Sequence, residues 1–355
     1  MAITADDVKN ALRNVNDPDL QKDLVTLNMI SDIKINGNNV AVKIELTTPA
    51  CPLKDKIQQD CVAAIKKEIP EVGLIAVTMG AKVQQGKNQR MSEILPGVKN
   101  TIAVASGKGG VGKSTVAVNL AVALALDGAK VGLIDADIYG PSIPAMFGIA
   151  DRQPDSTSFG DKEIMFPIEQ YGVKIMSIGF FIDQKQSLIW RGPMASNAIM
   201  QLIENTEWGD IDYMIIDFPP GTGDIQLTSM QKLNLSGAII VTTPQEIALN
   251  DARKAAGMFK NKDLNVPILG VIENMSWFSP ARHSDEYYYL FGKGGGHKLA
   301  TEFDTCLLGQ IPLVMEVGEA AEQGKTVFSQ SDISVLNAFE KIAELLLASD
   351  KLKQG

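Results

Sequence analysis

One segment constrains the fold of this 355-residue chain more than any other, the run GKGGVGKST at residues 107–115. It follows an apolar, β-branched stretch at 101–106 and precedes residues with helical spacing, so a strand, a glycine-rich loop and a helix follow one another. Glycines let successive backbone N–H groups turn inward around an anion, and a helix adds its positive N-terminal end. We therefore expect a phosphate-binding loop, in which Lys113 reaches the β- and γ-phosphates and Ser114 ligates Mg²⁺.

The remainder of the chain beyond residue 99 alternates short apolar runs with helical patterns. We expect strands at 102–106, 131–135, 173–178, 213–217, 238–242, 268–273 and 307–311, with helices such as 113–127 and 246–259 between them. Nearly continuous apolar strands are typical of a parallel sheet that is covered on both faces. The pattern predicts a doubly wound, mostly parallel α/β domain over 99–355, a fold that binds ligands at the carboxyl ends of its strands.

Residues 1–83 predict a separate, small α+β domain. A helical pattern through Val8, Leu12 and Val15 precedes alternating strands at 30–35 and 40–46, a helix at 53–68 and a strand at 73–79. The polar run QQGKNQR at 84–90 has no apolar period, and we expect a linker over 84–98.

Composition excludes several classes of partner and location. A net charge of −9 argues against strong nonspecific binding to DNA or anionic lipid. No apolar run approaches the roughly 20 residues that span a bilayer, and the N-terminus shows no secretory signal. Three cysteines are too few for a disulfide framework. We expect a cytoplasmic protein with no nucleic-acid and no membrane partner.

Two further predicted strands end in carboxylates. Strand 131–135 ends at Asp135, with Asp137 two residues later, and strand 213–217 ends at Asp217 in a Walker-B pattern before a glycine-bearing loop. One of Asp135 and Asp137 can hold Mg²⁺ through water while the other orients the attacking water, and Asp217 would contact the water shell of the metal. Taken alone, each acid is as readily a helix N-cap or a turn residue.

Several motifs carry a resemblance to a known family. The loop with its additional Lys108 resembles the deviant Walker A box of the MinD/ParA/nitrogenase-iron-protein class. Within that class, residues 95–99, 135–142, 190–194, 218–224 and 273–276 are similar to the Mrp/ApbC family of ATP-dependent iron–sulfur cluster carriers. Residues 17–19 and 47–52 resemble the metal–sulfur assembly domain that often precedes these ATPases, so the resemblance covers nearly the whole chain.

The resemblance implies specific roles. It implies a homodimer that forms through the nucleotide face, with Lys108 acting across the dimer, and catalysis by Lys108, Lys113 and Asp137. Magnesium would be held by Ser114, Asp135 and Asp217. Asn274 would read adenine, although taken alone it indicates a turn. The residues expected to bind ATP are Gly107, Lys108, Gly109, Gly110, Val111, Gly112, Lys113, Ser114, Thr115 and Asn274.

The implied activity is an ATPase that uses hydrolysis as a conformational switch and transfers iron–sulfur clusters to apoproteins. The alternative is a MinD/ParA-like positioning or partition ATPase without cluster binding. Membrane-targeted relatives use a terminal helix with a basic face. Here acidic residues offset the lysines near the apolar stripe at 335–347, so we expect this helix to dock onto the sheet.

The chain departs from the family pattern in its thiols. Mrp-type carriers usually place Cys-x-x-Cys shortly after Glu-Asn-Met-Ser, where this chain has Pro280 and His283. We expect Cys61 and Cys306 to be buried. We expect an aromatic run at 287–289 to pack against the protein, with a contact surface as the alternative. Cys51 lies between prolines near a helix start, where a helix dipole can lower its pKa. Cys51 is thus the candidate cluster or thiol site, with an unreactive loop cysteine as the alternative, and any iron–sulfur cluster is expected to be transient.

Overall fold

The computed structural model describes residues 3–17, 22–27, 29–46, 54–81, 94–160, 162–182, 192–223, 226–227, 230, 232–233, 235–261, 264–280, 283, 285–329, 333–349 and 352. The chain divides into two compact units, Met1–Gln84 and Gln85–Gly355, and each is considered by itself. Most of the predicted linker falls outside the described residues, as do Cys51 and residues 18–19 of the family motifs. Among the helices that are described, none is long and apolar enough to cross a membrane.

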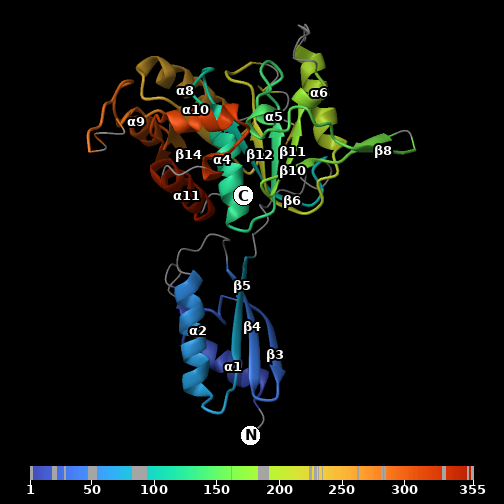
Figure 1. The fold of residues 1–355 in the computed structure, drawn as a ribbon, viewed down its shortest axis with the longest axis vertical. Coiled ribbons are helices and arrows are strands. Elements are labelled where there is room, and N and C mark those ends of the chain that lie inside the picture. Colours follow the sequence, from blue (N-terminus) through green and yellow to red (C-terminus); the bar gives the residue numbers. More distant parts are fainter. Residues whose placement is uncertain are drawn as a thin grey trace. The chain divides into compact units, whose positions relative to one another are not determined.

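An eight-stranded sheet organises the larger unit (Figure 1). Its order is β10-β11-β7-β12-β6-β13-β14-β15, and every neighbouring pair is parallel except β10 with β11. The fold class predicted from the alternating apolar runs is therefore confirmed. The strands are β6 (Val98–Ala105), β7 (Val131–Asp135), β10 (Ile168–Gln170), β11 (Val173–Ser177), β12 (Ile211–Asp217), β13 (Gly237–Thr242), β14 (Ile268–Glu273) and β15 (Cys306–Gln310).

Helices cover both faces of this sheet because the chain winds in two directions from β6. The connection from β6 through α4 (Lys113–Leu126) to β7 runs one way, whereas those through α8 (Glu246–Phe259) and α9 (Gly295–Glu302) run the other. Right-handed crossovers then place α4 on one face and α8 and α9 on the opposite face. The remaining helical elements are α5 (Ile143–Met146), η1 (Ile178–Phe180), α6 (Gly192–Glu204), α10 (Met315–Glu322), η2 (Val327–Ser329) and α11 (Ile333–Leu347).

The central helix α4 is apolar around most of its circumference, as expected of a helix that is covered on all sides. It packs on the central strands and is covered in turn by α11, which lies beside it in Figure 1 and also contacts β15. The apolar stripe of α11 is buried, including Val335, Phe339 and Leu346. The prediction that this terminal helix docks onto the sheet is confirmed.

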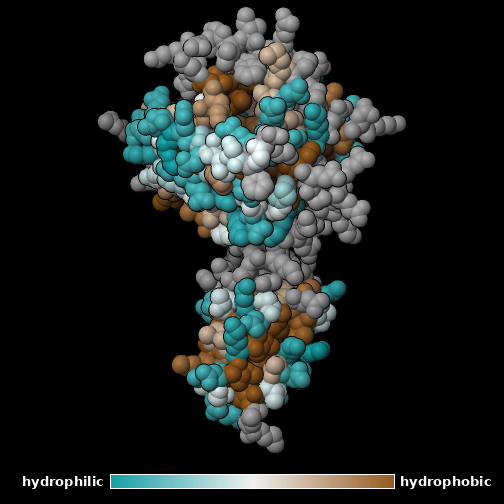
Figure 2. Space-filling model, turned by 90° about the vertical axis from the view of Figure 1, so that its right-hand side faces the viewer, coloured by the Kyte–Doolittle hydropathy of each residue, from teal (hydrophilic) through white to brown (hydrophobic). Residues whose placement is uncertain are grey.

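The smaller unit is a three-stranded sheet with two helices. Its elements are α1 (Ala5–Leu12), β1 (Asn16–Asp17), β2 (Lys22–Asp23), β3 (Ile30–Asn36), β4 (Asn39–Leu46), α2 (Lys54–Glu68) and β5 (Ile75–Ala81). Strand β4 pairs antiparallel with β3 and parallel with β5. A reciprocal pair of hydrogen bonds between Thr4 and Asp7 caps α1. Hydrophobic residues also reach the surface of this unit (Figure 2), among them Leu74.

Three details differ from the sequence prediction. The antiparallel edge strand β10 and the hairpin of β8 (Ser156–Phe159) and β9 (Lys162–Met165) were not predicted. The aromatic run Tyr287, Tyr288 and Tyr289 is exposed rather than buried, although the Tyr287 ring contacts the ring of Trp277. Cys306 is exposed as well, because β15 is the last strand in the sheet order and has no neighbour beyond it.

Candidate nucleotide site

The phosphate-binding loop joins the carboxyl end of β6 to the first residue of α4, as the sequence predicts. Gly110 and Gly112 adopt φ values of 81° and 82°, in the left-handed region that favours glycine. Gly107 lies so close to α8 that a Cβ there would be 2.0 Å from the backbone carbon of Asp251. Glycine is thus favoured at these three positions, and the loop leads into the N-terminus of α4.

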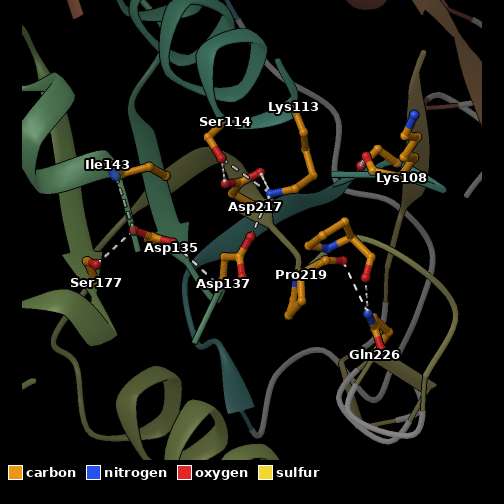
Figure 3. A network of polar contacts seen from close by, with 12 residues as sticks. Lys108, Lys113, Ser114, Asp135, Asp137, Ile143, Ser177, Asp217, Pro219 and Gln226 are labelled. Carbon is orange, nitrogen blue, oxygen red and sulfur yellow. Dashed lines mark hydrogen bonds and ion pairs between the residues drawn. The ribbon is translucent and has the colours of Figure 1, made fainter. Parts of the chain in front are cut away.

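Lys113 and Ser114 both point at Asp217, which ends the central strand β12 (Figure 3). The Lys113 Nζ donates to Asp217 Oδ1 at 2.6 Å, and the Ser114 Oγ donates to Asp217 Oδ2 at 2.6 Å. The ammonium also lies 3.6 Å from Asp137 Oδ2. Lys113, Asp137 and Asp217 are all buried, so one positive charge lies between two carboxylates in a site largely screened from water.

Asp135 supports this group from the neighbouring strand. It pairs in register with Asp217 across β7 and β12, and its Oδ1 accepts from the backbone N–H of Asp137 at 3.2 Å. Its Oδ2 accepts from the Ser177 hydroxyl at 2.9 Å and from the Ile143 backbone N–H at 3.2 Å. Asp135 therefore orients Asp137 and joins β7, β11 and α5 at the edge of the site.

Burial changes the titration of Asp135 and Asp217. Complete burial, reinforced by the charge of Asp217, raises the pKa of Asp135 to about 7. Burial also raises the pKa of Asp217, although the charge of Lys113 and the hydrogen bonds from Lys113 and Ser114 oppose that shift. The cation thus keeps Asp217 more acidic than its burial alone would allow.

The site has a polar atom whose hydrogen-bonding capacity is not used within the protein. Asp137 Oδ1 is buried and has no hydrogen-bond partner among the residues that the structure describes. Buried polar atoms in proteins are nearly always paired, and this one lies beside Lys113 and the loop. A phosphate with its associated metal and water would fit these groups. Among the described residues, no three His, Cys, Asp or Glu side chains are arranged to hold a metal by themselves.

Two predicted nucleotide ligands, Lys108 and Asn274, do not contact the acids that surround Lys113 among the described contacts. Lys108 is exposed, and its side chain extends away from the acids in Figure 3. Asn274 follows β14 and is buried, and its Nδ2 donates to the carbonyl oxygen of Val111 at 2.9 Å. Asn274 therefore reaches the phosphate-binding loop, and its role in reading adenine stays a prediction.

The loop after β12 is connected to the phosphate-binding loop. The Gly221 backbone N–H donates to the Ser106 carbonyl at 2.9 Å, and the Ser106 hydroxyl donates to the Lys108 carbonyl at 3.0 Å. Gln226 Nε2 donates to the Pro220 carbonyl at 2.9 Å and so closes the loop on itself. Asp224 of this loop lies outside the described residues.

Sequence reasoning missed Ser177 and Gln226 as parts of the site. Ser177 ends β11 beside β7, so the rule that strand ends share one edge could have identified it. Gln226 gave no signal in the sequence, because its contacts depend on how the loop folds back.

The thiols differ in accessibility. Cys61 is buried inside α2, and burial raises the pKa of its thiol to about 12, which makes it a poor metal ligand. Cys306 is exposed at the start of β15, and its Sγ donates to the Leu269 carbonyl at 3.3 Å. His283 is exposed on the loop after β14.

Comparison with known proteins places this site in a family. Residues 97–347 match a family model described as ParA, NUBPL iron-transfer P-loop NTPase, and residues 5–77 match one described as iron–sulfur cluster assembly protein. A Synechocystis protein named iron–sulfur cluster carrier protein is 47% identical over 96% of both chains. A Deinococcus radiodurans protein with the same name is 47% identical over 90% of this chain and 87% of its own length.

A solved structure supports the same relationship. A nucleotide-binding protein from Archaeoglobus fulgidus in complex with ADP aligns with a TM-score of 0.59 and 36% identity, covering 69% of this chain and 94% of that one. The shared region is large enough to contain the whole sheet and its loops. On these matches, the chain belongs to the ParA family of NUBPL-type iron-transfer P-loop NTPases.

Proposed function

We propose that this protein is a Mg²⁺-dependent ATPase that carries iron–sulfur clusters and transfers them to apoproteins. The observation that carries the proposal is the similarity of 96% of the chain to a named iron–sulfur cluster carrier. The glycine-rich loop, with Lys113 beside Asp217 at the end of β12, supports it. The match over nearly the full length includes the small unit, so both parts of the carrier are represented. A MinD/ParA-like positioning ATPase would not account for the assembly-domain match at residues 5–77.

The nucleotide chemistry follows from the cluster around Asp217. Lys113 would exchange a carboxylate partner for the β- and γ-phosphates, since phosphate oxygens offer the ammonium equivalent charge-assisted hydrogen bonds. Ser114, Asp135 and Asp217 would hold Mg²⁺, and the bound metal would supply positive charge beside the phosphates. Asp137 would hold the attacking water through its Oδ1 atom, which is unpaired within the described part of the chain.

We infer that Lys108 acts across a homodimer formed through the nucleotide face. Lys108 is exposed and directed away from its own acids, as a residue that serves another subunit would be. Large exposed apolar side chains follow the carboxyl ends of several strands: Tyr139 after β7, Ile247 after β13, Leu290 after β14 and Met315 after β15. Large exposed apolar side chains of this kind are common in protein interfaces.

Hydrolysis would act as a conformational switch through the loop after β12. That loop begins at Asp217 and is hydrogen-bonded to the phosphate-binding loop through Gly221 and Ser106. Loss of the γ-phosphate would therefore change the conformation of both loops together.

Turnover by two lysine variants tests the ATPase proposal. Lys113→Ala is expected to lose ATP binding and hydrolysis. Lys108→Ala is expected to keep ATP affinity and lose hydrolysis, and mixing it with Lys113→Ala would restore no more than the activity that one intact site allows. Full hydrolysis by Lys108→Ala would contradict a role across the dimer.

Cluster transfer tests the carrier proposal. The wild-type protein is reconstituted anaerobically with iron and sulfide, its absorbance is recorded, and the holoprotein is incubated with an apo iron–sulfur enzyme. Cys51→Ala is expected to lower cluster uptake, whereas Cys61→Ala is the matched control because that thiol is buried. Absence of iron uptake by the wild type would contradict the carrier role.

A further inference from the structure

Both the nitrogen and the oxygen of the Asn274 side-chain amide are hydrogen-bonded to the protein main chain. The Nδ2 atom donates to the carbonyl oxygen of Val111 at 2.9 Å, and Oδ1 accepts from the backbone N–H of Met275 at 3.0 Å. Asn274 is only 8% exposed, although it adjoins a loop at the surface. One of its two partners is thus inside the phosphate-binding loop, 163 residues away along the chain.

The packing between this amide and the loop leaves no free space. A Cβ built on Gly112 would lie 2.1 Å from Asn274 Nδ2, so only glycine fits beside the amide. Gly112 is the N-cap of α4, and Lys113 follows it as the first residue of the helix. A displacement of Val111 or Gly112 would therefore move the backbone that positions the Lys113 ammonium.

Asn274 is itself firmly held, as a supporting residue must be. Its backbone N–H donates to the Thr242 carbonyl on β13 at 2.8 Å. The preceding residue, Glu273, is buried and accepts hydrogen bonds from Gly296 and Gln310. The following residue, Met275, has a φ of 55°, a conformation that residues other than glycine rarely adopt. The amide is therefore presented to the loop from a fixed strand end.

We propose that Asn274 is a positioning residue that holds the phosphate-binding loop in its binding conformation through the Val111 carbonyl. This inference rests on the proposed nucleotide site and adds a residue to it. A residue that positions the loop acts on the phosphate end of the ligand, so its loss weakens every polyphosphate whatever base it carries. A residue that reads adenine acts on the base alone.

The experiment compares affinities for Mg-ATP, Mg-GTP and inorganic tripolyphosphate by calorimetry. Asn274→Ala is expected to weaken all three by a similar factor of about five- to tenfold, the loss that follows from one buried hydrogen bond. Asn274→Leu keeps the volume of the side chain without its hydrogen bonds and is expected to behave in the same way. Asn250→Ala is the matched control, since Asn250 is an exposed asparagine on α8 that contacts Arg253 and is expected to leave all three affinities unchanged.

Hydrogen–deuterium exchange supplies a readout that does not depend on binding. In protein without nucleotide, the loop amides at 109–113 are expected to exchange faster in both variants at Asn274 than in wild type. Unchanged affinities with unchanged exchange would overturn the inference, as would a loss confined to ATP with tripolyphosphate unaffected. Failure of the wild type to bind Mg-ATP would instead overturn the nucleotide site itself, and this inference with it.

Discussion

Replacement of Lys113 by methionine provides a direct test of the charge balance in the site. The ammonium lies 2.6 Å from Asp217 Oδ1 and 3.6 Å from Asp137 Oδ2, and both acids are buried. At an effective dielectric constant of about 20, these two separations correspond to gross attractions of about 6 and about 5 kcal/mol. Desolvation offsets much of this, and removing one partner of a buried ion pair costs about 3–5 kcal/mol.

We expect Lys113→Met to lower the free energy of unfolding of the nucleotide-free protein by about 3–5 kcal/mol at pH 8. At roughly 2–4 °C per kcal/mol for a unit of this size, the melting temperature would fall by about 6–20 °C. The double variant Lys113→Met/Asp217→Asn is expected to recover most of the loss, because it removes the unpaired charge and keeps a side chain of the same size.

The pH dependence of this loss gives a second readout from the same samples. The pKa of Asp217 is already raised by burial, and losing the cation raises it further. The folded variant would then bind a proton that the unfolded chain releases, so its stability deficit shrinks as the pH falls from 8 toward 5. Thermal unfolding at several pH values measures this trend. A Lys113→Met protein as stable as wild type at pH 8, or a double variant no better than the single one, would refute the reasoning.

Three further predictions concern the packing and titration of the same unit. Gly107→Ala would force a Cβ to within 2.0 Å of the α8 backbone, and we expect a loss of at least about 3 kcal/mol together with loss of ATP binding. Gly257→Ala on α8, where a Cβ meets nothing within 4 Å, is its control and should gain about 0.5–1 kcal/mol in denaturant unfolding. Asn119→Ala should cost about 1–3 kcal/mol, because the buried Asn119 amide links the Thr115 carbonyl to the Val327 N–H, and urea titration measures it. Since the pKa of Asp135 is raised to about 7 and that of the unfolded chain is near 4, this carboxyl lowers the stability of the nucleotide-free protein as the pH rises between those values. The urea midpoint of Asp135→Asn should therefore vary less than that of wild type across this range, and an equal variation would contradict the assignment.

The sequence was sufficient to predict two parts of the site. One depends on a local sequence pattern, and the other on the rule that parallel strands end at the same edge of a sheet. The glycine-rich loop is encoded within a few residues, and the ends of parallel strands meet at one edge, so Asp135 and Asp217 could be assigned to one site without knowing the strand order. The contact between Asn274 and Val111 could not be predicted in this way. It depends on β13 lying between β6 and β14, and on the left-handed conformation of Met275.

The predictions of burial failed at Cys306 and at residues 287–289 because burial depends on which other elements pack over a segment. An apolar or aromatic run in the sequence signals burial only if another element packs over it. Cys306 begins β15, which has no strand beyond it among the described residues, and the tyrosines at 287–289 follow β14 and remain exposed. The edge strand β10 has only three residues, too few for a periodic pattern to be recognised.

The position of β12 between β6 and β7 has a consequence for how the protein is made. As the chain emerges from the ribosome, β6 and β7 are complete more than 70 residues before β12 begins at Ile211. Until then, two apolar strands have no partner between them, and unpaired strands of this kind promote aggregation. Synthesis therefore passes through an interval in which the edges of β6 and β7 that pair with β12 stay open, and a truncation before Ile211 would leave them open for good.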